Sequence, residues 1–79
     1  MQNIKIYGSG CKKCLKLYVN VLEAIEGKES HYSVEKITDM ESIIAEGIMS
    51  TPVLTVDGKK VITGQIASIK TIQEILGIA

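Results

Sequence analysis

Two cysteines stand where the apolar pattern of the chain changes from that of a strand to that of a helix. Residues 3–7 alternate polar and apolar side chains, which predicts a short strand, and the glycine-containing residues 8–10 interrupt it. The apolar residues that follow recur at the three- and four-residue intervals of one helix face: Cys14, Tyr18, Val21, Leu22 and Ile25. We therefore expect Cys11 at the amino end of a helix.

This position predicts a reactive thiol at Cys11. Unpaired backbone N–H groups and the helix dipole favour negative charge at a helix N-terminus. They lower the pKa of a thiol there, and the thiolate is the form that attacks disulfides or binds metals. The cationic side chains of Lys12 and Lys13 should favour the thiolate further, although solvent and salt screen exposed charges. Cys14 lies three residues on, on the same side of the helix and within reach of a disulfide.

The remaining patterns predict three more strands and two more helices. A second strand is expected over residues 31–37, and a short helix follows it at the Thr38–Glu41 capping box. An extended segment over residues 50–56 leads to a hairpin turn at Asp57-Gly58. The helices and strands expected to flank these elements are a first helix over residues 11–26, a returning strand over residues 60–63 and a last helix over residues 66–76.

This order predicts an α/β fold. A strand, a helix and a second strand in succession imply a right-handed crossover and a parallel strand pair. The hairpin adds two strands, so the expected architecture is βαβαββα, with a four-stranded mixed sheet and helices on both faces. Residues 1–79 are expected to form a single domain, because so short a chain cannot build two hydrophobic cores.

Composition argues against two classes of partner. The formal net charge is zero, whereas a nucleic-acid-binding protein needs a basic surplus to displace counterions from phosphates. No apolar run approaches the ~20 residues of a membrane span.

The chain runs almost directly from Met1 into its first strand, without the pattern of a signal peptide, so we expect a cytoplasmic protein. In that reducing compartment a close cysteine pair is more often catalytic or metal-binding than structural.

The order of elements and two motifs resemble the thioredoxin superfamily, in particular its small thioredoxin/glutaredoxin-like redox-active disulfide proteins. The motifs are Cys11-x-x-Cys14 at the start of the first helix and Thr51-Pro52 before the third strand. The resemblance covers the whole chain and implies that Cys11 is the exposed nucleophile and Cys14 the buried resolving thiol. It also implies a cis peptide bond at Thr51-Pro52, where backbone groups pair with an extended substrate. Gly64 matches one glycine of the Gly-Gly-x-x-Asp stretch with which glutaredoxins bind glutathione.

We therefore expect a thiol–disulfide oxidoreductase that needs no bound cofactor or metal. The resemblance implies a disulfide-containing protein substrate and a reductase of the thioredoxin-reductase kind, and it leaves glutathione open as a further partner. The chain departs from thioredoxins at two positions. Lys5 stands where they carry an acidic residue six positions before the first cysteine, and Gly10 stands where they carry tryptophan.

A soft-metal binding protein is the alternative. Small carriers of βαββαβ order also place Cys-x-x-Cys after a first strand, and two thiolates hold Cu(I) linearly. Such carriers favour methionine two positions before the first cysteine, where this chain has Ser9, and they end on a strand rather than a helix. A structural zinc site needs four ligands, against two cysteines and the distant His31.

Overall fold

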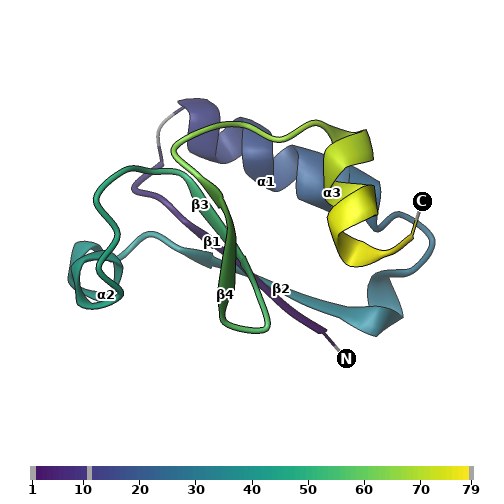
Figure 1. The fold of residues 1–79 in the computed structure, drawn as a ribbon, viewed down its shortest axis with the longest axis horizontal. Coiled ribbons are helices and arrows are strands. Elements are labelled where there is room, and N and C mark those ends of the chain that lie inside the picture. The colour runs from purple at the N-terminus through teal and green to yellow at the C-terminus, as the bar shows by residue number, and fades with distance from the viewer. Residues whose placement is uncertain (1, 11, 79) are drawn as a thin grey trace.

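The alternating segment at the amino end forms an inner strand of a four-stranded sheet. In this computed structural model, which describes residues 2–10 and 12–78, the strand order is β2-β1-β3-β4 (Figure 1). Strand β1 (Gln2–Tyr7) pairs parallel with β2 (Tyr32–Ile37) and antiparallel with β3 (Val53–Val56). Strand β4 (Lys59–Thr63) is antiparallel to β3. The predicted mixed sheet is confirmed.

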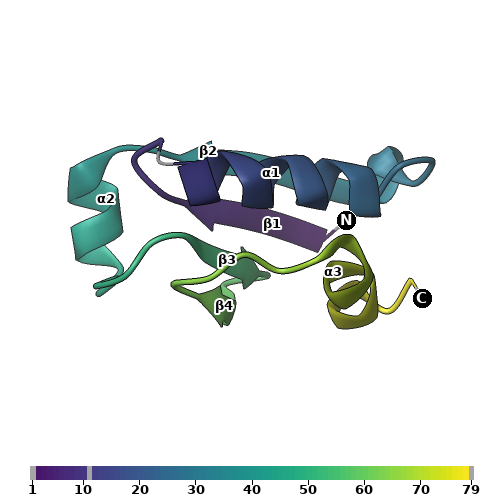
Figure 2. The same cartoon turned by 90° about the horizontal axis from the view of Figure 1, so that it is seen from above.

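Helices lie on both sides of this sheet, as predicted. Helix α1 (Lys12–Ala24) and helix α3 (Ile69–Leu76) share one face, whereas α2 (Met40–Ala45) lies at the end where β1 finishes (Figures 1 and 2). A short 3-10 helix, η1 (Glu29–His31), precedes β2. Within residues 2–10 and 12–78, no helix combines the length and the apolarity that crossing a bilayer requires.

The main hydrophobic core lies between the sheet and the pair α1 and α3. Its largest fully buried members include Ile4 and Ile6 of β1, Leu17 of α1, Leu54 of β3 and Ile72 of α3. Each such side chain contributes about 1.5–3 kcal/mol when it leaves water. This core therefore holds α1, and with it Cys14, at a fixed position on the sheet.

A smaller hydrophobic cluster lies on the opposite face. Tyr7, Ile43 and Val53 are buried together, with Ile37 and Ile48 packed against them. Successive side chains of a strand point to opposite faces, so Tyr7 faces α2 while its neighbour Ile6 faces α1. This cluster fixes α2 and the segment that leads into β3.

The turn between β3 and β4 is the predicted hairpin. Asp57 and Gly58 both have positive φ, 52° and 85°, as a type I′ turn requires. Asp57 is also tied to β1, because its backbone N–H donates to the carbonyl of Asn3 at 2.7 Å and its carboxylate accepts from the Asn3 N–H at 2.9 Å.

The predicted start of the second helix was wrong by one residue. Asp39, not Thr38, caps α2, because its side chain accepts hydrogen bonds from the backbone N–H of Ser42 at 2.8 Å and from the Ser42 hydroxyl at 2.7 Å. Both residues are good N-cap types. The capping box with Glu41 that the sequence suggested does not set this terminus.

The last helix is shorter than predicted. Ile66 fits the apolar period, yet it lies outside α3 and is 42% exposed. Helix α3 starts at Ile69, because Ser68 caps it and accepts a hydrogen bond from the Thr71 N–H at 3.2 Å. Residues 64–68 are thereby left as a loop between β4 and α3.

Candidate functional site

The turn after β1 brings Cys14 into contact with Gly8. Cys14 is only 5% exposed, and a Cβ built on Gly8 would overlap its Sγ and lie 2.9 Å from its Cβ. The Gly8 N–H donates to the carbonyl of Ile37 at 2.9 Å, so the backbone here continues the β1–β2 pairing. Only glycine fits this close approach. The sequence marks Gly8 as the end of a strand, but it gives no sign of this contact with the cysteine.

The loop before β3 reaches the same place. The Cβ that Gly8 lacks would lie 3.9 Å from the Cβ of Thr51, so Gly8, Cys14 and Thr51 meet. The peptide bond between Thr51 and Pro52 is cis, as the resemblance implies. Thr51 is half-buried and Pro52 is buried. The turn after β1 and the distant Thr51-Pro52 loop therefore converge next to the cysteine of α1.

Gly64, the residue after β4, contacts the Thr51-Pro52 loop. Its backbone N–H donates to the carbonyl of Pro52 at 2.8 Å, and its φ is +70°. A Cβ added there would lie 3.3 Å from that of Ser50. The structure thus places Gly64 beside Thr51-Pro52.

A buried polar side chain fastens the loop after β4 to α1. Asn20 is 6% exposed, and its Nδ2 donates to the carbonyl of Ala67 at 2.9 Å. A buried amide without a partner is costly, so this bond fixes residues 64–68 against the helix. We did not predict this residue. Its position between Leu17, Val21 and Ala24 on the inward face of α1 is the signal that could have identified it.

Cys11 lies outside the described residues, so its reactivity stays a prediction. Lys12 and Lys13 are the first two residues of α1, and both are exposed. Lys5 is half-buried, and its alternation with Ile4 and Ile6 places it on the face opposite α1. The position that is acidic in thioredoxins therefore faces away from the helix that carries Cys14.

The described residues offer few metal ligands close together. Among residues 2–10 and 12–78, no group of three or more His, Cys, Asp or Glu side chains could hold a metal ion. His31 is exposed at the end of η1. The observed order of elements also differs from the βαββαβ order of the soft-metal carriers considered above.

The strand order and the three helices define a minimal thioredoxin-like α/β fold. A family model described as a thioredoxin domain matches residues 2–77, and the chain belongs to the thioredoxin family. A thioredoxin from Methanothermobacter thermautotrophicus is 40% identical over 76 residues, which cover 96% of this chain and 99% of that protein. A thioredoxin from Methanocaldococcus jannaschii is 38% identical over 71 residues, covering 90% of this chain and 81% of that protein. These relatives indicate a thioredoxin-like redox function.

Proposed function

We propose that the chain is a thiol–disulfide oxidoreductase whose redox couple is Cys11 and Cys14, with residues 1–79 acting as one domain. One observation carries the proposal. Gly8, Cys14 and Thr51 meet, so the second cysteine of the Cys-x-x-Cys motif lies beside the loop that contains the cis peptide bond.

The two cysteines take different roles. In the reducing direction, the Cys11 thiolate attacks one sulfur of a substrate disulfide, forming a mixed disulfide and releasing the other sulfur as a thiolate. Cys14, as its thiolate, then attacks the Cys11 sulfur, which forms the internal disulfide and releases the second substrate sulfur. The burial of Cys14 supports its role as the second attacker, since an incoming protein cannot reach it easily.

The loop at Thr51-Pro52 is proposed to hold the substrate. In this family the backbone before the proline pairs with an extended segment of substrate, much as an added strand pairs with a sheet edge. The hydrogen bond that the Gly64 N–H donates to the Pro52 carbonyl supports that role, because it holds the Thr51-Pro52 loop against the residue that follows β4. The proposed partners are a disulfide-containing protein and a reductase of the thioredoxin-reductase kind, with glutathione as an alternative small reductant.

Reduction of insulin disulfides tests the proposal. Wild type, Cys11→Ser, Cys14→Ser and the exposed-residue control Ser9→Ala are compared with dithiothreitol, glutathione or a thioredoxin reductase as the electron source. We expect turnover by wild type and Ser9→Ala and none by Cys11→Ser. Cys14→Ser should form a mixed disulfide with the substrate and stop there, which mass spectrometry of the trapped adduct detects.

Two outcomes would contradict the proposal. One is unchanged turnover by Cys11→Ser. The other is stoichiometric, tight Cu(I) binding by the reduced wild type together with no turnover under any of the three reductants, because that combination is the behaviour of a soft-metal carrier. Comparing the wild-type turnover rates with glutathione and with the thioredoxin reductase shows which of the two is the better electron donor.

A further inference from the structure

Helix α1 carries a second apolar stripe on its outer side. Leu15, Val19 and Leu22 are 46%, 44% and 40% exposed, and they follow one another at intervals of four and three residues. At 100° per residue, this stripe lies well away from the inward-facing Leu17 and Val21. We call Leu15, Val19 and Leu22 the α1 stripe. None of its members is needed to fill the core.

The spacing of the α1 stripe is that of a helix-pairing seam. Single exposed apolar residues are ordinary, but apolar residues repeated at four and three residues form the contact line between two paired helices. Helix α3 does not cover this line, because it packs on the side of α1 where Asn20 reaches Ala67. Within residues 2–10 and 12–78, this part of the helix face is therefore left exposed.

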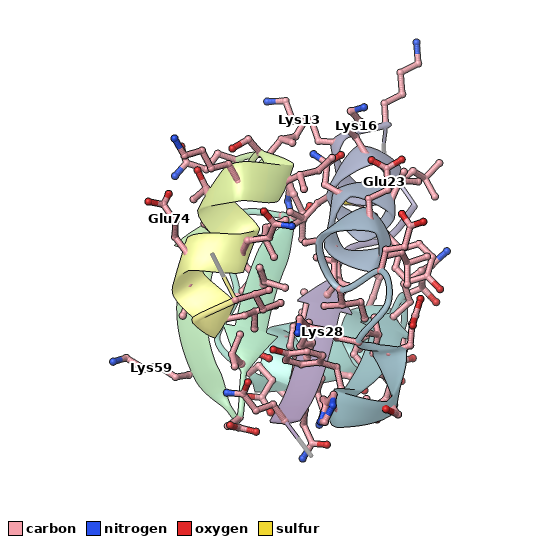
Figure 3. All side chains as sticks on the ribbon, turned by 90° about the vertical axis from the view of Figure 1, so that its right-hand side faces the viewer. Lys13, Lys16, Glu23, Lys28, Lys59 and Glu74 are labelled. Carbon is pink, nitrogen blue, oxygen red and sulfur yellow. The ribbon has the colours of Figure 1, made fainter. Side chains whose placement is uncertain are left out.

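The charges beside the α1 stripe change sign along the helix. Lys12 and Lys16 accompany its amino-terminal half, and Glu23 accompanies its carboxyl-terminal half; all three side chains are exposed. Figure 3 shows Lys16 and Glu23 on α1, clear of the sheet below it. An identical helix laid antiparallel to α1 would meet each basic end with an acidic end.

The register of this pairing follows from the helix rise. Lys16 lies three residues before Val19 and Glu23 lies four residues after it, about 4.5 Å and 6 Å along the axis. A two-fold axis at Val19 would bring Lys16 within about 1.5 Å, in axial position, of the partner's Glu23. A parallel pair would instead place lysines level with lysines and glutamates level with glutamates along the axis, so no lysine would face a glutamate at its own height.

We propose that the α1 stripe is a self-association surface, on which two copies of the chain pair their α1 helices antiparallel about Val19. This proposal is independent of the proposed redox function. The helix is short, so the contact is smaller than the ~1,600 Å² of a standard stable interface. The dimer is therefore weak and reversible, and salt weakens it further because its matched charges are at the rim. The antiparallel arrangement places the amino ends of the two helices, where Cys11 lies in sequence, at opposite ends of the pair.

Sedimentation equilibrium of the reduced protein, up to about 1 mM and in about 50 or 500 mM salt, tests this pairing. The variants are Val19→Asp, Lys16→Glu, Glu23→Lys and the double variant Lys16→Glu/Glu23→Lys. Val19→Asp should raise the dimer dissociation constant at least about tenfold, because it places two carboxylates at the axis. Each single charge reversal should weaken the dimer severalfold. The double variant should return within about threefold of wild type, because its charges again match across the axis.

Control charge reversals lie on other elements. Lys59→Glu on β4 and Glu74→Lys on α3, which Figure 3 also shows, should leave the dissociation constant unchanged. All of these residues are exposed, so circular dichroism should show the same fold for every variant. A wild type that stays monomeric at about 1 mM in low salt would overturn the proposal. So would a dimer that Val19→Asp leaves intact, or a double variant no better than its two parents.

Discussion

The sulfur of Cys14 occupies the space that a side chain on Gly8 would need. A methyl group at residue 8 would overlap the Cys14 Sγ and would lie 2.9 Å from its Cβ. The turn that follows the strand ending at Tyr7 is therefore in direct contact with the helix that starts at Lys12. The fit links the position of a proposed redox residue to the absence of a side chain six residues earlier.

Gly8→Ala should disturb this contact. The added methyl must displace Cys14, and through it α1, so we expect a loss of about 1–3 kcal/mol in the free energy of unfolding. The initial rate of insulin reduction should also fall, because Cys14 moves relative to Thr51. Urea unfolding and the turnover assay measure the two effects.

Ser9→Ala is the matched control, because Ser9 is the next residue and is exposed. It should change the free energy of unfolding by no more than about 0.5 kcal/mol. If Gly8→Ala is as stable and as active as Ser9→Ala, the close approach of Gly8 and Cys14 contributes neither to stability nor to activity, and the prediction is wrong.

Asn20→Ala should free the loop that follows β4. The substitution leaves the buried carbonyl of Ala67 without its donor, which costs about 1–3 kcal/mol. Gln73→Ala is the comparison, since the Gln73 Nε2 donates to the carbonyl of Ala24 at 3.3 Å, away from the site. Both variants should lose stability, but only Asn20→Ala should increase amide hydrogen exchange over residues 64–68. Equal exchange in this loop for the two variants would contradict the role assigned to Asn20.

Thr55→Val should stabilise the protein. Thr55 is 4% exposed, and within the described part of the chain its buried hydroxyl has no hydrogen-bond partner. Replacing that hydroxyl with a methyl group of similar size should add about 1 kcal/mol and raise Tm by roughly 4–8 °C. Thr55→Ser keeps the hydroxyl and removes the methyl, so its Tm should fall. A calorimetric scan of the three proteins tests this order, and a lower Tm for Thr55→Val than for wild type would refute it.

The cap of α2 should weaken in acid. Hydrogen bonds from the Ser42 hydroxyl and from the Ser42 backbone N–H hold the pKa of Asp39 below its ordinary value. The stabilisation from the Asp39 carboxylate is therefore complete above the unfolded-state pKa of about 3.9 and is lost as pH falls through the lower folded-state pKa. The stability advantage of wild type over Asp39→Asn should shrink over that acidic range in urea titrations.

Asp39→Ser provides the comparison for that titration, because serine also caps helices and does not ionise there. Its stability relative to Asp39→Asn should stay the same across the acidic range. A wild-type advantage over Asp39→Asn that is equally constant would show that the carboxylate charge does not contribute to the cap.

Removing the two lysines of the motif should slow the first step of exchange. Lys12 and Lys13 are exposed, so their effect on the Cys11 thiolate is screened and should be modest. Lys12→Ala/Lys13→Ala should reduce the rate of Cys11 alkylation by iodoacetamide at neutral pH and shift its pH profile upward. Raising the ionic strength should narrow the difference from wild type, and identical alkylation profiles would remove these residues from the proposed site.

The fold could be predicted because most of its signals are local. Alternation marked β1, and the Asp57-Gly58 pair marked a turn that needs two positive φ angles. The helix starts were harder to place, since adjacent residues compete for the same role. Thr38 and Asp39 are both good caps, and only the observed hydrogen bonds to Ser42 decide between them.

The candidate site was only partly predictable. Motif and resemblance predicted roles for Cys14, Thr51 and Gly64; the structure brings these residues to one region, and their roles stay predictions. Gly8 and Asn20 were missed because their importance depends on contacts with residues that lie far along the chain or across a turn. A glycine that must stay small and an asparagine that must find a carbonyl look, in sequence, like a loop residue and a helix residue.

Residues 64–68 connect α1 to the Thr51-Pro52 loop, because Asn20 donates a hydrogen bond to Ala67 and Gly64 donates one to Pro52. This connecting segment lies more than forty residues after Asn20 in the chain. An unfolded chain has the same two cysteines but neither of these hydrogen bonds. If the proposed function holds, selective disulfide exchange at the motif begins only after the carboxyl-terminal third of the polypeptide has been made and packed against α1. A nascent or truncated chain would then carry the two cysteines without the proposed substrate-binding loop in place.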